Sequence, residues 1–259
     1  MSVDMTRSVD EIARISRDTD AREVAIGAYQ RLFDQLEQLE PEQWSAPTEC
    51  PGWDVAAMVG HLIGAAKNAA SMREATRQQW WAKRHADEFD GSTLDASTAL
   101  QVRDHVQLWP EERLAALRDV APAAVRARMR LPRLMRRMTA HLEQSGSLAP
   151  GTPTSVTFGE LMDVILTRDV WMHRIDIARA TEQPIVLDEE TDRRIVEDVV
   201  VEWAARHGQP FNLTLRGPAG GGFRQGEDGE HLEYHPVEFC RVLSGRAPAD
   251  GLLTTRVLF

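Results

Sequence analysis

Residues 50–62 have the sequence Cys50-Pro-Gly-Trp-Asp-Val-Ala-Ala-Met-Val-Gly-His61-Leu62, which predicts a turn followed by the start of a helix. Pro51 and Gly52 favour the turn, and Asp54 is a good N-cap because its carboxylate can accept hydrogen bonds from free backbone amides. His61 follows about two turns into the helix, among small neighbours that leave room around an imidazole. The helix is predicted from an apolar stripe at helical spacing, formed by Val55, Met58, Val59, Leu62 and Ile63.

A second segment, Thr167-Arg-Asp-Val-Trp-Met-His173-Arg-Ile-Asp176, also has helical character. Asp169 and His173 are four residues apart, so on a helix they lie one above the other and can both reach one ion. A third ligand from another helix, His61, would complete a three-ligand site with an open position, as in catalytic zinc sites. From the residues alone, the alternative is an ion pair on a solvated helix face.

Helical periodicity extends from Asp20 to about His207. Capping boxes at residues 20–23 and 157–160 open two helices, the second of which carries both Asp169 and His173. Several long helices joined by short loops predict a mainly α protein, in which inward side chains of a helical bundle can build a metal site. Further helices are predicted over residues 97–118 with a restart at Pro110, over 122–144 and over 189–207, with a loop over 146–153.

The pattern changes after Gly208. Residues 211–216 and 231–234 alternate in polarity as strands do, with a turn predicted over 217–222 and a short helix over 236–244. We therefore expect a helical bundle in residues 1–207, with 1–19 as a flexible end, and a small α/β region in 208–259.

Composition narrows the function classes. Thirty basic against forty acidic side chains give a net charge of −10, which disfavours general binding to nucleic acid. The basic segment 126–137 is expected to form a solvated helix face, with an anion site as the alternative. No apolar run approaches the ~18 residues of a membrane span, and residues 1–20 do not have the pattern of a secretory signal. Two cysteines, Cys50 and Cys240, cannot form a disulfide framework. We expect a cytoplasmic protein that does not bind membranes.

The two segments around His61 and Asp169–Asp176 together resemble the mycothiol-dependent maleylpyruvate isomerase family. Residues 239–246 and 251–253 also fit that family's C-terminal region. The resemblance implies a DinB-like four-helix bundle with a divalent metal, usually zinc. It assigns metal ligation to His61, Asp169 and His173, although the family's isomerases have glutamate where this chain has the shorter Asp169. The family also has an aspartate at Asp176, which could accept the second ring N–H of His173 or make a structural hydrogen bond.

The resemblance also implies a cofactor and a reaction. Neither cysteine lies among the candidate ligands, so the reactive sulfur would come from mycothiol or a related low-molecular-weight thiol. A thiolate could add to an activated double bond and leave again after rotation, giving cis–trans isomerisation, or it could stay attached, giving S-transfer. Arg241 and Arg246 are candidates to stabilise negative charge on a small electrophilic substrate, because the family's C-terminal region contributes an arginine near the site. The competing prediction is a non-catalytic metal-binding or ligand-binding bundle.

Overall fold

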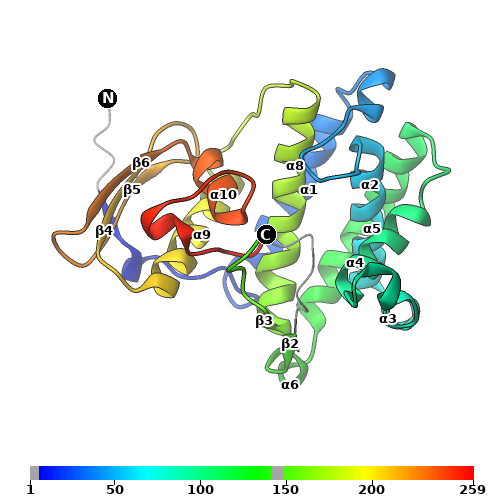
Figure 1. Ribbon diagram of the computed structural model, residues 1–259, viewed down its shortest axis with the longest axis horizontal. Helices are drawn as coiled ribbons and strands as arrows, with labels where there is room; N and C mark the ends of the chain where they lie inside the picture. Colours follow the sequence, from blue (N-terminus) through cyan, green and yellow to red (C-terminus); the bar gives the residue numbers. More distant parts are fainter. Residues whose placement is uncertain (1–5, 142–148) are drawn as a thin grey trace. The chain divides into compact units, whose positions relative to one another are not determined.

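The computed structural model describes residues 6–141 and 149–259, and the chain clusters into two compact units. The helical unit comprises residues 21–147 and 154–185, and the sheet unit comprises 1–20, 148–153 and 186–259. Figure 1 shows the helices and strands coloured by their position in the sequence, from blue at the N-terminus to red at the C-terminus.

The helical unit is built from packed helices, of which α2 contacts both α4 and α5, while α1 contacts α5 and α8. The apolar stripe predicted for residues 55–63 is buried on α2, which confirms that helix. The helices of this unit are α1 (Ala21–Leu36), α2 (Val55–Ala70), α3 (Met72–His85), α4 (Thr93–Arg103), α5 (Pro110–Arg130), α6 (Arg133–Arg136), α7 (Phe158–Glu160) and α8 (Leu166–Ala180).

The middle of the helical unit differs from the sequence prediction. The restart predicted at Pro110 is confirmed, because α4 ends at Arg103 and α5 begins at Pro110. However, α5 continues through Pro122, where a new helix was expected. Proline removes one backbone donor, but the buried face of α5 runs unbroken past it, so packing on α2 outweighs the lost bond. Residues 139–141 are a strand, β2 (Thr139–His141), which pairs antiparallel with β3 (Ser155–Thr157), so the helix predicted over 122–144 was wrong there.

Two other predicted segments fall partly outside the described residues. These are the end of the helix expected over 122–144, at 142–144, and the first part of the loop expected over 146–153, at 146–148. Residues 149–153 contain no helix or strand, as predicted for that loop.

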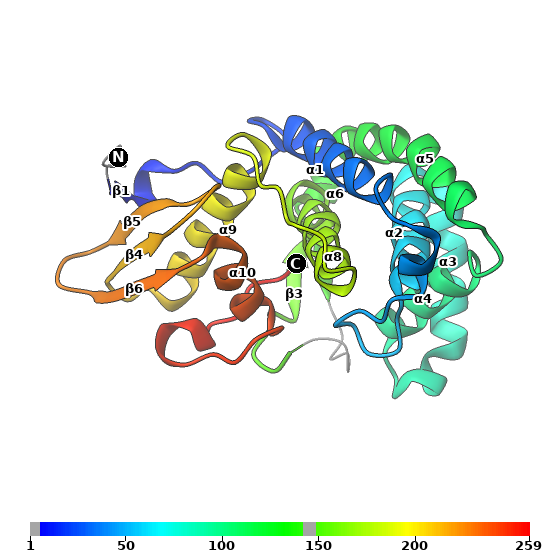
Figure 2. The same ribbon diagram turned by 90° about the horizontal axis from the view of Figure 1, so that it is seen from above.

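The sheet unit contains a four-stranded sheet in the order β1-β5-β4-β6, which Figure 2 shows from above. The central strand β4 pairs antiparallel with β5 and parallel with β6, and β1 pairs parallel with β5. The two predicted strands are confirmed, and a third, β5, begins inside the predicted turn. The elements are β1 (Arg7–Ser8), α9 (Thr191–His207), β4 (Phe211–Leu215), β5 (Gly221–Gln225), β6 (Glu230–Tyr234) and α10 (Pro236–Ser244).

The boundary between the units differs from the expected one at residue 207, because α9 belongs to the sheet unit. Trp203 of α9 has no exposed surface, and its ring centroid lies 4.7 Å from that of Phe211 and 5.4 Å from that of Phe239. These aromatic contacts tie α9 to β4 and α10.

The N-terminal segment was expected to be flexible, which stays a prediction, and its described part, residues 6–19, makes specific contacts in the sheet unit. Arg7 pairs with Phe223 in the sheet, and Arg14 donates hydrogen bonds to Asp198 (2.8 Å) and Glu202 (3.0 Å) of α9.

In the described part of the chain, no helix is both long and apolar enough to cross a bilayer.

Candidate metal centre

The turn before α2 places an aromatic ring against the candidate ligands. Gly52 has a φ of +81°, a conformation that glycine adopts at low cost, and Thr48 Oγ1 donates to the carbonyl of Trp53 at 2.9 Å. Asp54 is the N-cap, accepting a hydrogen bond from the Ala57 amide at 2.7 Å, as predicted. The Trp53 ring consequently lies 5.1 Å from the His61 ring and 6.2 Å from the His173 ring, measured between centroids.

The structure brings together the three predicted ligands within the helical unit. His61 comes from α2, and Asp169 and His173 come from α8, which follows a π-helical turn at Leu161–Ile165. One donor atom from each residue can be chosen so that all three lie within 4.8 Å of one another. Both histidines are 7% exposed, whereas the Asp169 side chain is 20% exposed. The cluster is therefore mostly buried, and solvent reaches it at Asp169.

The spacing of these donor atoms is informative. Asp169 Oδ2 lies 3.5 Å from His61 Nε2, and Asp169 Oδ1 lies 3.3 Å from His173 Nε2. Charge-assisted N–H···O bonds are usually about 2.7–2.9 Å long, so both pairs are too far apart for strong direct bonds. A tetrahedral ion with ligand bonds of about 2.0–2.1 Å would separate its ligand atoms by about 3.3 Å. The two distances end on different oxygens of Asp169, and together with the residue types they make these three side chains a candidate group of metal ligands.

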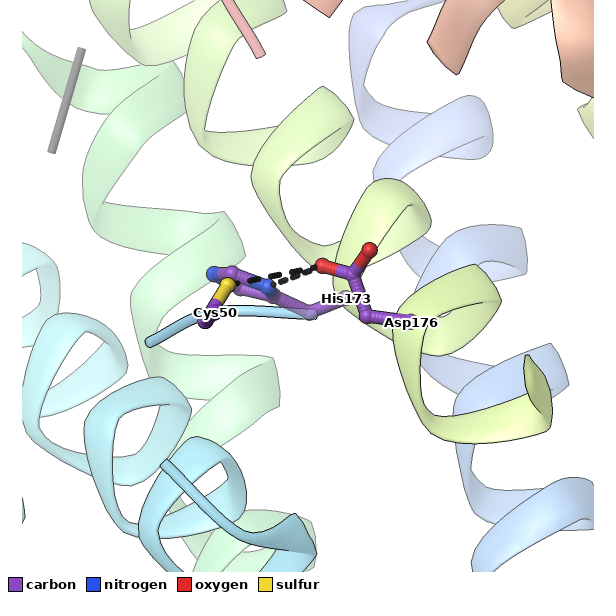
Figure 3. A group of neighbouring side chains, drawn as sticks. All are labelled: Cys50, His173 and Asp176. Carbon is purple, nitrogen blue, oxygen red and sulfur yellow. Dashed lines mark hydrogen bonds and ion pairs between the residues drawn. The ribbon is translucent and has the colours of Figure 1, made fainter. Parts of the chain in front are cut away.

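His173 also belongs to a second group of potential ligands, with Cys50 and Asp176 (Figure 3). Its Nδ1 lies 2.9 Å from Asp176 Oδ2, and Cys50 Sγ lies 3.9 Å from the same oxygen. A neutral imidazole has one N–H and one lone pair, so His173 offers a lone pair on only one side. Because Asp176 has no exposed surface and sits at hydrogen-bond distance, the geometry favours Nδ1–H on that side and ligation through Nε2.

Asp169 and His173 shift each other's pKa values. Burial by itself lowers the pKa of His173, but the Asp169 carboxylate and hydrogen bonds to Asp169 and Asp176 raise that pKa well above its ordinary value. Burial would raise the pKa of Asp169, but the charges of His173 and His61 hold it well below its usual range. Asp169 is therefore a carboxylate at neutral pH. In the absence of a cation, His173 is protonated on both ring nitrogens and is positively charged.

The two predicted catalytic arginines lie in the sheet unit. Arg241, on α10, is buried and donates a hydrogen bond to Glu238 Oε2 at 2.7 Å, and its Nη2 donates to the carbonyl of Arg246 at 3.4 Å. Arg246 is half-buried. Their catalytic role stays a prediction.

Sequence reasoning missed Arg128, which it assigned to a solvated basic face. Arg128 is 2% exposed and donates from Nη2 to Thr167 Oγ1 at 2.8 Å, and no described residue accepts from its Nε. Together with Tyr29 and Asp169 it lines an enclosed cavity of about 10 Å³, roughly the room for one water molecule. The sequence signal was weak, because an arginine in a basic helix segment usually faces solvent.

A wider cleft of about 440 Å³ lies at the start of α2, with a volume in the range of small-molecule sites. Trp53 lines this cleft and also contacts the rings of both His61 and His173. The cleft is lined by Ser45, Pro47, Gly52, Trp53, Asp54, Ala56, Ala57, Val102, Val106 and Arg113.

The chain is similar to a known family and to solved structures. The family model described as the mycothiol maleylpyruvate isomerase N-terminal domain matches residues 27–178, a range that includes all three candidate ligands. Two solved structures are similar, the mycothiol-dependent maleylpyruvate isomerase and a histidine-to-alanine variant of it. Each has a TM-score of 0.55 at 12% identity, and the match covers 93% of both chains, which is a likeness of fold. No curated protein matches the chain.

Proposed function

We propose a function on the premise that this chain belongs to the mycothiol maleylpyruvate isomerase N-terminal domain family, whose model matches residues 27–178. The proposed function is that of a divalent-metal-dependent cytoplasmic enzyme that uses mycothiol, a low-molecular-weight thiol, on a small electrophilic substrate. The reaction is cis–trans isomerisation or S-transfer.

The fold we propose for the helical unit is a DinB-like four-helix bundle formed by α1, α2, α5 and α8. Contacts of α2 with α5 and α8, and of α1 with α5 and α8, support this assignment. The three proposed ligands come from α2 and α8, facing helices of the bundle, which is where bundle proteins build metal sites.

The observation that carries the proposal is the spacing of His61 Nε2, Asp169 and His173 Nε2. Asp169 Oδ1 lies 3.3 Å from His173 Nε2 and Asp169 Oδ2 lies 3.5 Å from His61 Nε2, which is longer than strong charge-assisted hydrogen bonds and close to the separation of ligand atoms around a tetrahedral ion. Three protein ligands leave a fourth position for an exogenous group. A divalent ion bound there would hold the sulfur of a small thiol as a thiolate at neutral pH. We propose zinc as the ion, because two imidazoles and one carboxylate suit it.

The remaining residues of the site act on the ligands. Asp176 accepts a hydrogen bond from the Nδ1–H group of His173, so this ring presents its Nε2 lone pair to the site. The Trp53 ring lies beside the imidazoles of His61 and His173, tilted against both, and we propose that it helps to shield them from water. Cys50 Sγ lies 3.9 Å from Asp176 Oδ2 and is not among the three proposed ligands, so we do not assign it as the nucleophile.

In the isomerisation, the exogenous thiolate adds to one carbon of an activated cis double bond, and the electron pair moves onto a conjugated carbonyl oxygen. Rotation follows about what is now a single bond. The electron pair then returns, the double bond re-forms as trans, and the thiolate leaves unchanged. A guanidinium that contacts the oxygen would stabilise its transient negative charge, and we propose Arg241 or Arg246 for that role. In S-transfer, the thiolate displaces a leaving group and stays attached.

Metal analysis of the purified protein, followed by an assay of thiol consumption and product formation, tests the proposal. We expect about one zinc per chain and turnover that requires both metal and mycothiol. Consumption of mycothiol would indicate S-transfer, and turnover without consumption would indicate isomerisation. Full activity in a chelator-treated preparation without thiol would reject the function. Stoichiometric metal with no thiol-dependent turnover on any electrophile would favour the non-catalytic metal-binding bundle.

A further inference from the structure

A chain of buried amide side chains runs from α3 to His61. His61 Nδ1 lies 2.8 Å from Gln101 Oε1, and Gln101 Nε2 donates to Gln78 Oε1 at 2.8 Å. Gln78 in turn donates from Nε2 to the carbonyl of Gly64 and to Glu74 Oε1, both at 3.0 Å. Gln78 and Gln101 are 1% and 6% exposed, so neither amide can turn to water for an alternative partner.

The far end of this chain determines which way both amides face. A backbone carbonyl can only accept a hydrogen bond, and so can a carboxylate. Glu74 is a carboxylate at neutral pH, because its hydrogen bonds with Arg77 hold its pKa at about 2. The amide nitrogen of Gln78 must therefore face Gly64 and Glu74, which leaves its oxygen facing Gln101. Gln101 must then present its nitrogen to Gln78 and its oxygen to His61.

An oxygen facing His61 Nδ1 accepts a hydrogen bond from an N–H group at that nitrogen. The imidazole then keeps its proton on Nδ1 and its lone pair on Nε2, the atom that faces Asp169 at 3.5 Å. We propose that Gln101 and Gln78 are positioning residues, which form an amide relay that fixes the tautomer and ring orientation of His61 for metal binding through Nε2. The inference rests on the proposed function in that the bound group is a metal ion.

A glycine on α2, Gly64, leaves room for the Gln101 side chain of the relay. Gly64 lies one turn after His61 on α2, and a Cβ at this position would come within 2.5 Å of the Gln101 side chain. The absence of a side chain at Gly64 lets Gln101 approach α2 closely enough to reach His61. The relay therefore draws on three helices, α2, α3 and α4, which pack on one another. His173 has a carboxylate, Asp176, in the corresponding position, so each proposed histidine ligand has its own hydrogen-bond acceptor.

The relay is tested by the tautomer of His61 and by zinc affinity. In the metal-free protein, at a pH where His61 is neutral, ¹⁵N chemical shifts should show a protonated Nδ1 and an unprotonated Nε2. Gln101→Met keeps the side-chain length but removes the acceptor, and it should weaken zinc binding about 10–100-fold in a competition assay with a chromophoric chelator. Gln78→Met should leave Gln101 free to turn, so the His61 tautomers should become mixed and zinc binding should weaken by a smaller factor.

Asn68→Ala is the matched control. Asn68 donates to the same Gln78 oxygen at 2.9 Å but is not part of the path to His61, so this variant should keep the wild-type tautomer and zinc affinity. An unprotonated Nδ1 in the wild-type protein would overturn the relay. So would wild-type tautomer and zinc affinity in both glutamine variants, while His61→Ala loses zinc. If His61→Ala itself binds zinc normally, the proposed metal centre fails, and the tautomer measurement on metal-free protein still decides the relay.

Discussion

His173 Nδ1 lies 2.9 Å from Asp176 Oδ2, the carboxylate one turn further along α8, and Asp176 has no exposed surface. A buried carboxylate at hydrogen-bond distance from the outer nitrogen of an imidazole orients that ring and increases the basicity of the other nitrogen. The contact is therefore a direct structural argument for ligation through His173 Nε2.

Replacing this carboxylate should weaken metal binding without removing a ligand. We expect Asp176→Asn to lower zinc affinity about 10–100-fold, because the neutral amide is a weaker acceptor for the His173 N–H. Glu37→Gln removes an exposed carboxylate that pairs with Arg118 on the same unit, and it should leave zinc affinity unchanged. Equal zinc affinities for Asp176→Asn and wild type, measured by chelator competition, would contradict the assigned role.

Asp169→Glu should retain zinc. It restores the residue type of the family's isomerases and adds one methylene, and the small cavity beside Asp169 and Arg128 gives the longer side chain some room. Asp169→Asn, which removes the charge but not the shape, should bind zinc much more weakly. Metal content after dialysis distinguishes the two, and loss of zinc from Asp169→Glu together with retention by Asp169→Asn would disprove carboxylate ligation.

Variants of Arg241 and Arg246 distinguish a catalytic role from a structural one. If either stabilises negative charge on the substrate, its replacement by methionine should lower kcat/KM by about 10²–10³-fold while zinc affinity stays at the wild-type value. Arg241→Met should also lower thermal stability, because Arg241 is buried and pairs with Glu238. Arg246→Met should have a smaller effect on stability. Wild-type kcat/KM in both variants would exclude them from the reaction.

The stability of the metal-free protein should fall as pH rises through the folded pKa of His173. That pKa is raised above the ordinary value of about 6.5, so the stabilising contribution of His173 is complete below that value and is lost above the folded pKa. Asp169, whose pKa is lowered, contributes above about pH 3.9 and loses its contribution as pH falls further. Zinc must displace the His173 proton, so zinc affinity should increase with pH over the same range.

Urea unfolding of the metal-free protein between about pH 6 and pH 9 checks this dependence. His173→Gln should remove most of the pH-dependent change, and zinc-loaded wild type should show little of it. The same slope in wild type and His173→Gln would show that other groups control stability in this range.

Short-range periodicity predicted much of the helical unit. The proposal of His61, Asp169 and His173 as ligands needed more, because the i,i+4 spacing of Asp169 and His173 equally allows an ion pair and the family resemblance favoured the metal site. The convergence of all three is what the structure adds to that prediction. The actual course of α5 could not be predicted, because the helix continues through Pro122 only as a result of packing against α2.

Other parts of the structure depend on contacts between distant residues. Gln78 and Gln101 are far apart in sequence, and nothing in their local pattern indicates that their amides meet beside His61. Arg128 belongs to a basic segment, and only the folded chain shows that it is buried beside Thr167. The short strand β1 has no detectable alternation, since it contains only Arg7 and Ser8 and is defined by its pairing with β5.

The central claim is that His61, Asp169 and His173 hold a metal ion whose open position takes the sulfur of an external thiol. Titration of mycothiol into the Co²⁺-substituted protein tests it most directly, because a thiolate bound to Co²⁺ gives a charge-transfer absorption band. We predict that the band is absent before mycothiol is added and saturates at about one thiol per chain. It should be retained in Cys50→Ser and Cys240→Ser and lost in His173→Ala. No band on saturation with mycothiol, or a band that is present without it and disappears in Cys50→Ser, would contradict the account.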